Sequence, residues 1–221
     1  PAYLAVAPDG SRACVSLQEN NAHPYVNLKP KSIDDIVGLG SKNFALAANP
    51  LDASDKDGKI NIVNWPASGF YMPDGLVAFS AKGKTYLISA NEGDDRDDFL
   101  PGGETARVKS LKLDPTVFPN ASTLQQDENL GRLTVSKIDG DTDGDGDYDQ
   151  LFAFGARSFS IWGADGTLAW DSGAALEQVT AAALPADFNS DNAKNNSFDT
   201  RSDNKGPEPE GVAVGQVNGH L

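Results

Sequence analysis

The chain has 221 residues, and its 18 basic and 32 acidic residues give a formal net charge of −14. This charge argues against a protein that binds nucleic acid or an anionic membrane, because phosphate would be repelled, and no apolar run approaches the roughly 18 residues of a membrane span. The single cysteine, Cys14, excludes a disulfide framework and a thiolate zinc site, and the two histidines, His23 and His220, leave little room for a His-rich metal centre.

The acidic residues are mostly aspartates, with 25 Asp against 7 Glu. Aspartate is disfavoured inside helices and strands and is favoured in turns, helix caps and sites for hard cations. A chain rich in Asp, Gly and Pro therefore reads as many short strands joined by polar loops.

Short runs of alternating apolar and polar residues, separated by turn sequences such as PDG and KGK, predict a series of β-hairpins. In the first part of the chain these strands are expected at residues 3–7, 12–17, 23–28, 32–40, 75–81 and 85–91. Further strands are expected at residues 106–113, 132–138, 150–155, 158–163 and 167–171. Residues 41–73, which interrupt the hairpins, read as an elaborated loop.

One short helix is expected near residues 173–184, where Ser172 can cap a run of apolar residues at helical spacing. Residues 114–131 read as a loop with a helical turn. The polar stretch 187–206 reads as a surface loop, either ordered by ligands or mobile. Residues 210–221 read as the start of another hairpin, with a turn at Asn218 and Gly219.

The repeated strand–turn–strand unit predicts an all-β protein, with a β-propeller as the first choice and a β-sandwich as the second. The chain has about four to five such units, and a closed propeller needs at least four blades. We therefore expect residues 1–221 to form a single β-propeller domain that is a fragment of a longer propeller.

Three strings give a resemblance to a known family: NEGDDR at 91–96, the Asp-rich stretch with its following strand at 141–162, and SDNKGPEPEGVAVG at 202–215. They resemble the bacterial choice-of-anchor I proteins. The resemblance implies an exported β-propeller that is secreted, periplasmic or at the cell surface. Members are sometimes described as alkaline-phosphatase-like or phytase-like, but the resemblance does not imply a particular reaction.

The sharpest local motif is DGDTDGDGDYD at residues 139–149, called the Asp loop below. Alternating carboxylates around glycines can wrap one Ca²⁺ ion with six to eight oxygen ligands. The predicted ligands are Asp141, Asp143, Asp145, Asp147 and Asp149. Phe152 stands where an EF-hand loop has its bidentate Glu. The alternative is a solvated acidic turn, in which six aspartates would repel one another without a cation.

A weaker motif of the same kind is LDASDKDGKINI at residues 51–62. Asp55, Asp57 and Gly58 fall at calcium-loop positions, but Ala53 stands where the first ligand would be. A polar turn before a strand is the favoured interpretation.

Two segments supply candidate catalytic residues. Glu92, Asp94 and Arg96 follow an apolar strand, where the carboxylates could bind metal and the arginine could orient them or hold an anion. Glu208 and Glu210 lie in a segment stiffened by prolines, which suits a carboxylate pair for a divalent ion or for acid–base chemistry. The alternatives are a surface ion pair for the first group and a proline-protected edge strand for the second.

Arg157 is a further candidate, because a strand could direct it into a channel where it would bind anions. A pairing with a nearby aspartate is the more ordinary role for such a residue.

These motifs leave three functions open. The favoured one is a calcium-binding extracellular β-propeller module acting in binding or surface interaction, because no motif specifies a nucleophile. The alternative is a calcium- or metal-dependent phosphoric-ester hydrolase, whose metals would hold phosphate and activate water. The third is a purely structural surface repeat. The expected partners are divalent cations, with either a phosphorylated small molecule or a cell-surface partner; whether the protein is an enzyme stays open.

Overall fold

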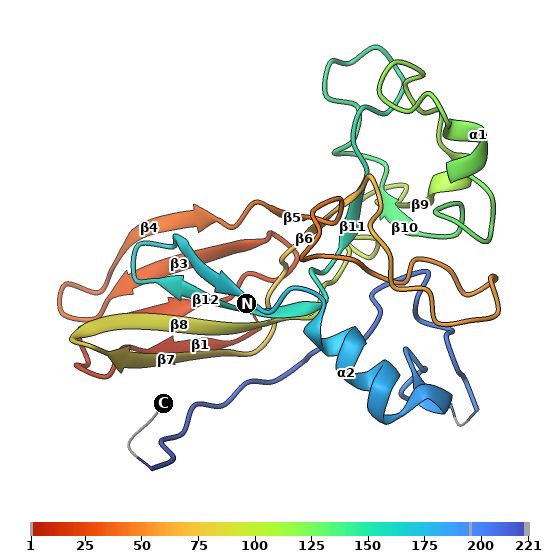
Figure 1. Cartoon of the computed structure of the whole chain (residues 1–221). Coiled ribbons are helices and arrows are strands. Elements are labelled where there is room, and N and C mark those ends of the chain that lie inside the picture. The colour runs from red at the N-terminus through yellow and green to blue at the C-terminus, as the bar shows by residue number, and fades with distance from the viewer. Residues whose placement is uncertain (1, 195, 219–221) are drawn as a thin grey trace.

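A computed structural model describes residues 2–194 and 196–218 of the chain (Figure 1). The described strands form three sheets, and short helices and long loops make up the rest. The prediction of an all-β protein with antiparallel sheets, long acidic loops and a short helix near 173–184 is confirmed. The sheets do not close into a barrel within the described residues, and their arrangement as propeller blades stays a prediction.

The first sheet is an antiparallel meander in which each strand pairs with the next along the chain. Its strands are β1 (Leu4–Val6), β2 (Arg12–Val15), β3 (Ala22–Asn27) and β4 (Ser32–Gly38). Both predicted hairpins of this region are confirmed, because each depends only on residues close in sequence.

The third sheet has the order β13-β12-β8-β7, and all its pairs are antiparallel. Its strands are β7 (Leu76–Ala81), β8 (Lys84–Asn91), β12 (Ser158–Gly163) and β13 (Leu168–Asp171). The pairing of β8 with β12 joins residues that are about 70 positions apart, so the long segment between them leaves the sheet and returns.

The segment between β8 and β12 contributes three of the five strands of the second sheet, called the central sheet below. Its order is β5-β6-β11-β10-β9. Its strands are β5 (Ser41–Asn43), β6 (Ser68–Phe70), β9 (Thr105–Arg107), β10 (Thr134–Ser136) and β11 (Phe152–Phe154). The β6–β11 pair is parallel, unlike the others. The expectation that residues 41–73 form only a loop is therefore wrong: β5 and β6 have three residues each, too few to show an alternating pattern.

The helices are short. They are α1 (Ala121–Leu124), α2 (Ala175–Ala183) and the 3-10 turns η1 (Val108–Ser110) and η2 (Pro185–Asp187). The strand expected at 106–113 is shorter than predicted, because η1 follows β9 directly. None of the described helices has the length and apolar character needed to cross a membrane.

Two hydrophobic clusters hold the sheets together. One lies between the first and third sheets, where Trp162 is fully buried and its indole N–H donates to Ser89 Oγ at 2.8 Å. Tyr71 and His23 meet the Trp162 ring edge-on, with centroids 5.0 and 5.8 Å away. The other cluster packs the central sheet against its loops and includes Phe44, Leu51, Leu130, Leu133 and Val135.

Two expectations about the C-terminal part are met only in part. Residues 187–206 are partly a surface loop, because Asn192, Ala193 and Lys194 are exposed, whereas Phe188, Asn189, Asp199 and Ser202 are buried. Residues 211–216 form no strand and run as an extended segment along the molecule (Figure 1). The hairpin turn predicted at Asn218 and Gly219 extends beyond the described residues, as does His220.

Candidate functional site

The Asp loop connects β10 to β11, and its backbone turns around one carboxylate. Asp141 accepts hydrogen bonds from the N–H groups of Gly144 and Gly146, at 2.7 and 3.0 Å. Both glycines have positive φ, 80° and 93°, a conformation that other residues adopt only with strain. The glycines therefore allow the loop to close on itself and bring its aspartates together.

Two groups of three carboxylates in this region have oxygens that all lie within 4.8 Å of one another. One consists of Asp141, Asp143 and Asp149. The other consists of Asp114, Asp147 and Asp149, so Asp149 belongs to both. Four of the five predicted metal residues are thus brought together, while Asp145 belongs to neither group.

Asp114 is a member that the motif did not reveal. It lies far from the loop in sequence but is held beside it by an isolated bridge between Leu113 and Tyr148. The Asp114 N–H also donates to the Tyr148 carbonyl at 3.1 Å. Because this contact is between distant segments, no local spacing could have predicted it.

Asp147 is the most buried carboxylate of the loop, with 6% of its surface exposed. Its Oδ2 pairs with Lys112 Nζ at 2.9 Å, whereas its Oδ1 is buried with no hydrogen-bond partner among the described residues. A buried carboxylate oxygen without a partner is unfavourable. A cation between Asp114, Asp147 and Asp149 would provide one.

Charge repulsion acts on the exposed side of the loop. The backbone hydrogen bond from Asp145 lowers the pKa of Asp143, but the negative charges of the surrounding aspartates outweigh it and the pKa is raised. A bound cation would reverse this effect.

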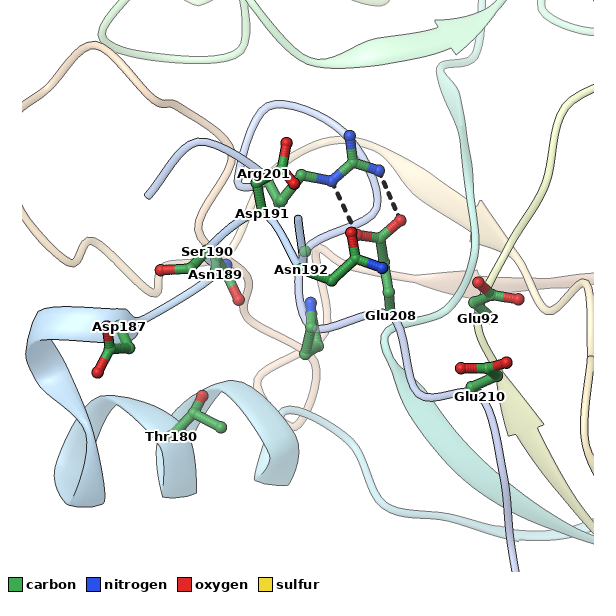
Figure 2. Close-up of a pocket in the computed structure, with 12 residues that line it drawn as sticks. Glu92, Thr180, Asp187, Asn189, Ser190, Asp191, Asn192, Arg201, Glu208 and Glu210 are labelled. Carbon is green, nitrogen blue, oxygen red and sulfur yellow. Dashed lines mark hydrogen bonds and ion pairs between the residues drawn. The ribbon is translucent and has the colours of Figure 1, made fainter. Parts of the chain in front are cut away.

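A second feature is a cavity of about 400 Å³, called the acidic cavity below (Figure 2). It is lined by Glu92, Thr180, Asp187, Asn189, Ser190, Asp191, Asn192, Arg201, Gly206, Pro207, Glu208 and Glu210. These residues come from the segment after β8, from helix α2 with the turn that follows it, and from the C-terminal segment. The structure thus joins Glu92 to Glu208 and Glu210, which belong to two separate motifs.

Glu208 is neutralised within the cavity wall. Arg201 binds it through both oxygens, with Nε–Oε2 at 2.8 Å and Nη2–Oε1 at 2.5 Å, and Lys205 Nζ lies 3.4 Å from Oε1. Burial raises the pKa of Glu208, but the Arg201 guanidinium outweighs it, so the pKa is lowered. Glu208 is therefore an ionised, fixed partner of Arg201 and is poorly suited to proton transfer.

No described residue forms an ion pair with Glu92 or Glu210, which lie near each other at one side of the cavity (Figure 2), although the charge of Lys205 partly offsets that of Glu92. Glu92 Oε2 accepts a hydrogen bond from Gln18 Nε2 at 2.8 Å, and burial raises the pKa of Glu92. Asp74 lies close by, and its pKa is raised by burial and by the charge of Glu210. This side of the cavity therefore carries negative charge that the protein leaves largely uncompensated.

The other candidates lie outside the cavity wall. Asp94 Oδ1 is 4.0 Å from Lys205 Nζ. Arg96 makes a bidentate ion pair with the fully buried Glu104, with Nε–Oε2 at 3.0 Å and Nη2–Oε1 at 2.5 Å, and it also reaches Asp139 at 3.4 Å. This geometry favours the alternative for Arg96, an ion pair that fixes the loop after β8.

Arg157 is buried and fully engaged. Its Nη1 donates to Glu177 Oε1 at 2.7 Å and to the Asp52 carbonyl at 2.6 Å, and its Nη2 donates to the carbonyls of Ser202 and Asn204 at 2.7 and 2.8 Å. It therefore connects the start of β12 to helix α2 and to the C-terminal segment. With both terminal nitrogens used, it does not serve as an exposed anion site.

The sheets and the two acid-lined features define an all-β protein with carboxylates gathered at the Asp loop and in the acidic cavity. The chain belongs to the choice-of-anchor I domain family, whose sequence model matches residues 1–221. The resemblance deduced from the sequence strings is thereby confirmed at the family level.

Two curated relatives are similar to parts of the chain. A mesenchyme-specific cell surface glycoprotein of Strongylocentrotus purpuratus is 30% identical over 218 residues, covering 84% of this chain and 28% of the relative. Gigasin-3a of Magallana gigas is 40% identical over 99 residues, covering 42% of this chain and 34% of the relative. The chain therefore spans about a third or less of each relative. No solved structure matches the chain.

Proposed function

We propose that this protein is a calcium-binding extracellular module that acts in binding at a surface. The observation that supports the calcium site is the pair of three-carboxylate groups sharing Asp149, each with oxygens within 4.8 Å of one another. Hard cations such as Ca²⁺ take six to eight oxygen ligands, so each group offers the core of a site that backbone carbonyls and water could complete.

The group of Asp114, Asp147 and Asp149 offers the better site. Asp147 is nearly buried, and Lys112 Nζ pairs with its Oδ2 at 2.9 Å, whereas its Oδ1 has no partner among the described residues and is left for an ion. The group also joins the Asp loop to the segment after η1. A bound ion would therefore stabilise a contact between two long loops.

The surface role is supported by family membership and by the name of one relative, a cell surface glycoprotein. The same comparison supports an extracellular or cell-surface location.

The hydrolase alternative receives no support from the cavity. Among the described residues that line the cavity the arginine is Arg201, and Glu208 holds it in a bidentate pair, so it is not free to bind a phosphate ester. Phosphate would have to be held there by metal ions, and the groups of acids close enough to share one ion lie in the Asp loop region. A binding function is therefore the proposal that the charges favour.

The experiment is a titration with Ca²⁺ by calorimetry, together with thermal unfolding in Ca²⁺ and in chelator. At about 100 times its Kd, the ion should stabilise the protein by about 2.7 kcal/mol, which raises the midpoint by several degrees. Asp147→Asn should remove most of this rise. Glu128→Gln, an exposed acid outside both groups, should preserve it. An unchanged midpoint for the native chain would overturn the proposal.

A further inference from the structure

We infer that the acidic cavity is a binding site for a ligand that carries an organic cation, an ammonium or a guanidinium group. This inference goes beyond the proposed calcium site, because the cavity and the Asp loop share no residue.

The first observation is the charge of the cavity wall. Five carboxylates line it, from Glu92, Asp187, Asp191, Glu208 and Glu210, against one lining cation, Arg201. The charge of Arg201 is neutralised by its bidentate ion pair with Glu208. The remaining four lining acids leave the wall with a net negative charge, which attracts positive charge.

The second observation is an acceptor inside the wall that has no donor. Asn189 is 5% exposed, and its Nδ2 donates to Glu177 Oε1 at 3.0 Å and to Ser202 Oγ at 2.9 Å. Because only the amide nitrogen can donate to the Glu177 carboxylate, the amide orientation is set and Oδ1 faces the other way. No described residue donates to Oδ1, and the neighbouring Ser190 Oγ is also buried without a partner.

A ligand that donates hydrogen bonds would satisfy Asn189 Oδ1. Ammonium offers three donors and guanidinium five, and neither has an acceptor that the wall would repel. Figure 2 shows Asn189 and Ser190 on the opposite side of the cavity from Glu92 and Glu210. A ligand that contacts both sides must therefore be larger than a single ion.

The size of the cavity agrees with this conclusion. Its volume of about 400 Å³ is in the range of small-molecule sites, which begins near 300 Å³. Among the described residues, the groups of acids close enough to share one ion belong to the Asp loop region, and none includes a cavity carboxylate. The spread of the cavity acids suits an extended organic cation better than a bare metal.

The same chemistry could come from two sources, a basic side chain of a partner protein or a free polyamine. Both would place a donor-only group against the same acceptors. The test therefore includes arginine amide and spermidine as separate probes.

The test is calorimetry on the whole chain in saturating Ca²⁺, so that the Asp loop is occupied. We expect arginine amide or spermidine to bind with a Kd of about 1 mM or tighter. Arginine amide and citrulline amide are used with acetylated α-amino groups, so that the guanidinium is the cationic group of the first and the second is neutral. Citrulline amide should therefore bind at least about tenfold more weakly. Binding by arginine amide indicates a side-chain ligand, and binding by spermidine alone indicates a free amine; either supports the inference.

Variants locate the site. Glu92→Gln and Glu210→Gln preserve shape and should each weaken binding roughly threefold, and together about tenfold. The matched control is Asp98→Asn, an exposed acid in the neighbouring loop that does not line the cavity, and it should bind like the native chain. Thermal unfolding of each variant verifies that it is folded.

Three outcomes would overturn the inference: neither cation binds, citrulline amide binds as well as arginine amide, or the Gln variants bind like the native chain. An additional Ca²⁺ equivalent that competes with arginine amide, and that Glu92→Gln and Glu210→Gln remove, would also overturn it in favour of a metal site. Loss of calcium binding at the Asp loop would leave the result at the cavity unaffected, so the two proposals can fail separately.

Discussion

Arg157 Nη1 lies 2.7 Å from Glu177 Oε1, and both side chains are almost completely buried. Glu177 Oε1 also accepts from Asn189 Nδ2, and its Oε2 accepts from the Asp52 N–H at 3.0 Å. The Arg157–Glu177 ion pair and the hydrogen bonds of these two side chains thus connect the residue before β12, helix α2, the 51–62 loop and the wall of the acidic cavity. It is the structural support on which the cavity depends.

Removing one partner of this pair should destabilise the protein strongly. Glu177→Gln would leave the Arg157 charge buried without a counter-ion, and we expect a loss of about 3–5 kcal/mol in the free energy of unfolding. Urea denaturation measures this loss in the free energy of unfolding. Arg12→Gln, which breaks the exposed pair with Asp34 at 3.1 Å, is the control and should cost about 1 kcal/mol or less. Similar losses for the two variants would contradict this role.

Asp149 should matter more for calcium than any other residue of the Asp loop, because it belongs to both carboxylate groups. Asp149→Asn is expected to weaken Ca²⁺ binding more than Asp143→Asn, and Asp145→Asn is expected to have the smallest effect. Calorimetric titration of the three variants gives the order. An effect of Asp145→Asn as large as that of Asp149→Asn would show that the loop closes differently around the ion.

His23 should make the protein sensitive to mild acid. Burial lowers the pKa of His23 to about 4, and neither ring nitrogen has a hydrogen-bond partner among the described residues. The unfolded chain binds the proton near pH 6.5, so the stability that His23 contributes is complete above that pH and is lost as the pH falls toward 4. The expected loss is up to about 3 kcal/mol.

The measurement is urea denaturation of the native chain and of His23→Phe between pH 7 and 4. The difference between them isolates His23 from Asp52 and Asp199, whose pKa values are raised by burial to about 6 and about 7 and which act in the opposite direction. A difference that is constant over this range would contradict the prediction.

Gly93 should tolerate no side chain, although it lies in a loop. Its φ is 91°, and a Cβ there would lie 2.5 Å from the Cα and N of Gly155. Gly93→Ala is expected to destabilise the protein by more than about 2 kcal/mol and to displace Glu92, the adjacent cavity residue.

Gly83→Ala is the matched control, because Gly83 also has a positive φ, 73°, but has open space around it. Gly83→Ala should lower the free energy of unfolding by about 1–2 kcal/mol, because of the backbone conformation alone. Thermal unfolding compares the two, and equal losses would show that the Gly93–Gly155 contact is unimportant.

The features that could be predicted from the sequence are those formed by neighbouring residues. The hairpins of β1–β2, β3–β4 and β7–β8 follow from alternating runs and their turns, and helix α2 follows from helical spacing. The Asp loop belongs to the same kind, because its aspartates and glycines lie within eleven residues. Local backbone conformation decides all of these.

The sequence by itself therefore determined the β class, the family and the position of the Asp loop. The tertiary structure decided which acids meet: Asp114 joins the loop through a bridge beside Tyr148, and Glu92 lies near Glu210 at one side of the cavity. It also decided that Arg157 is a buried support and that Phe188, Asn189, Asp199 and Ser202 are buried. The physical reason is that these contacts join segments far apart in sequence, whose pairing depends on burial and charge in the folded chain and leaves no local pattern.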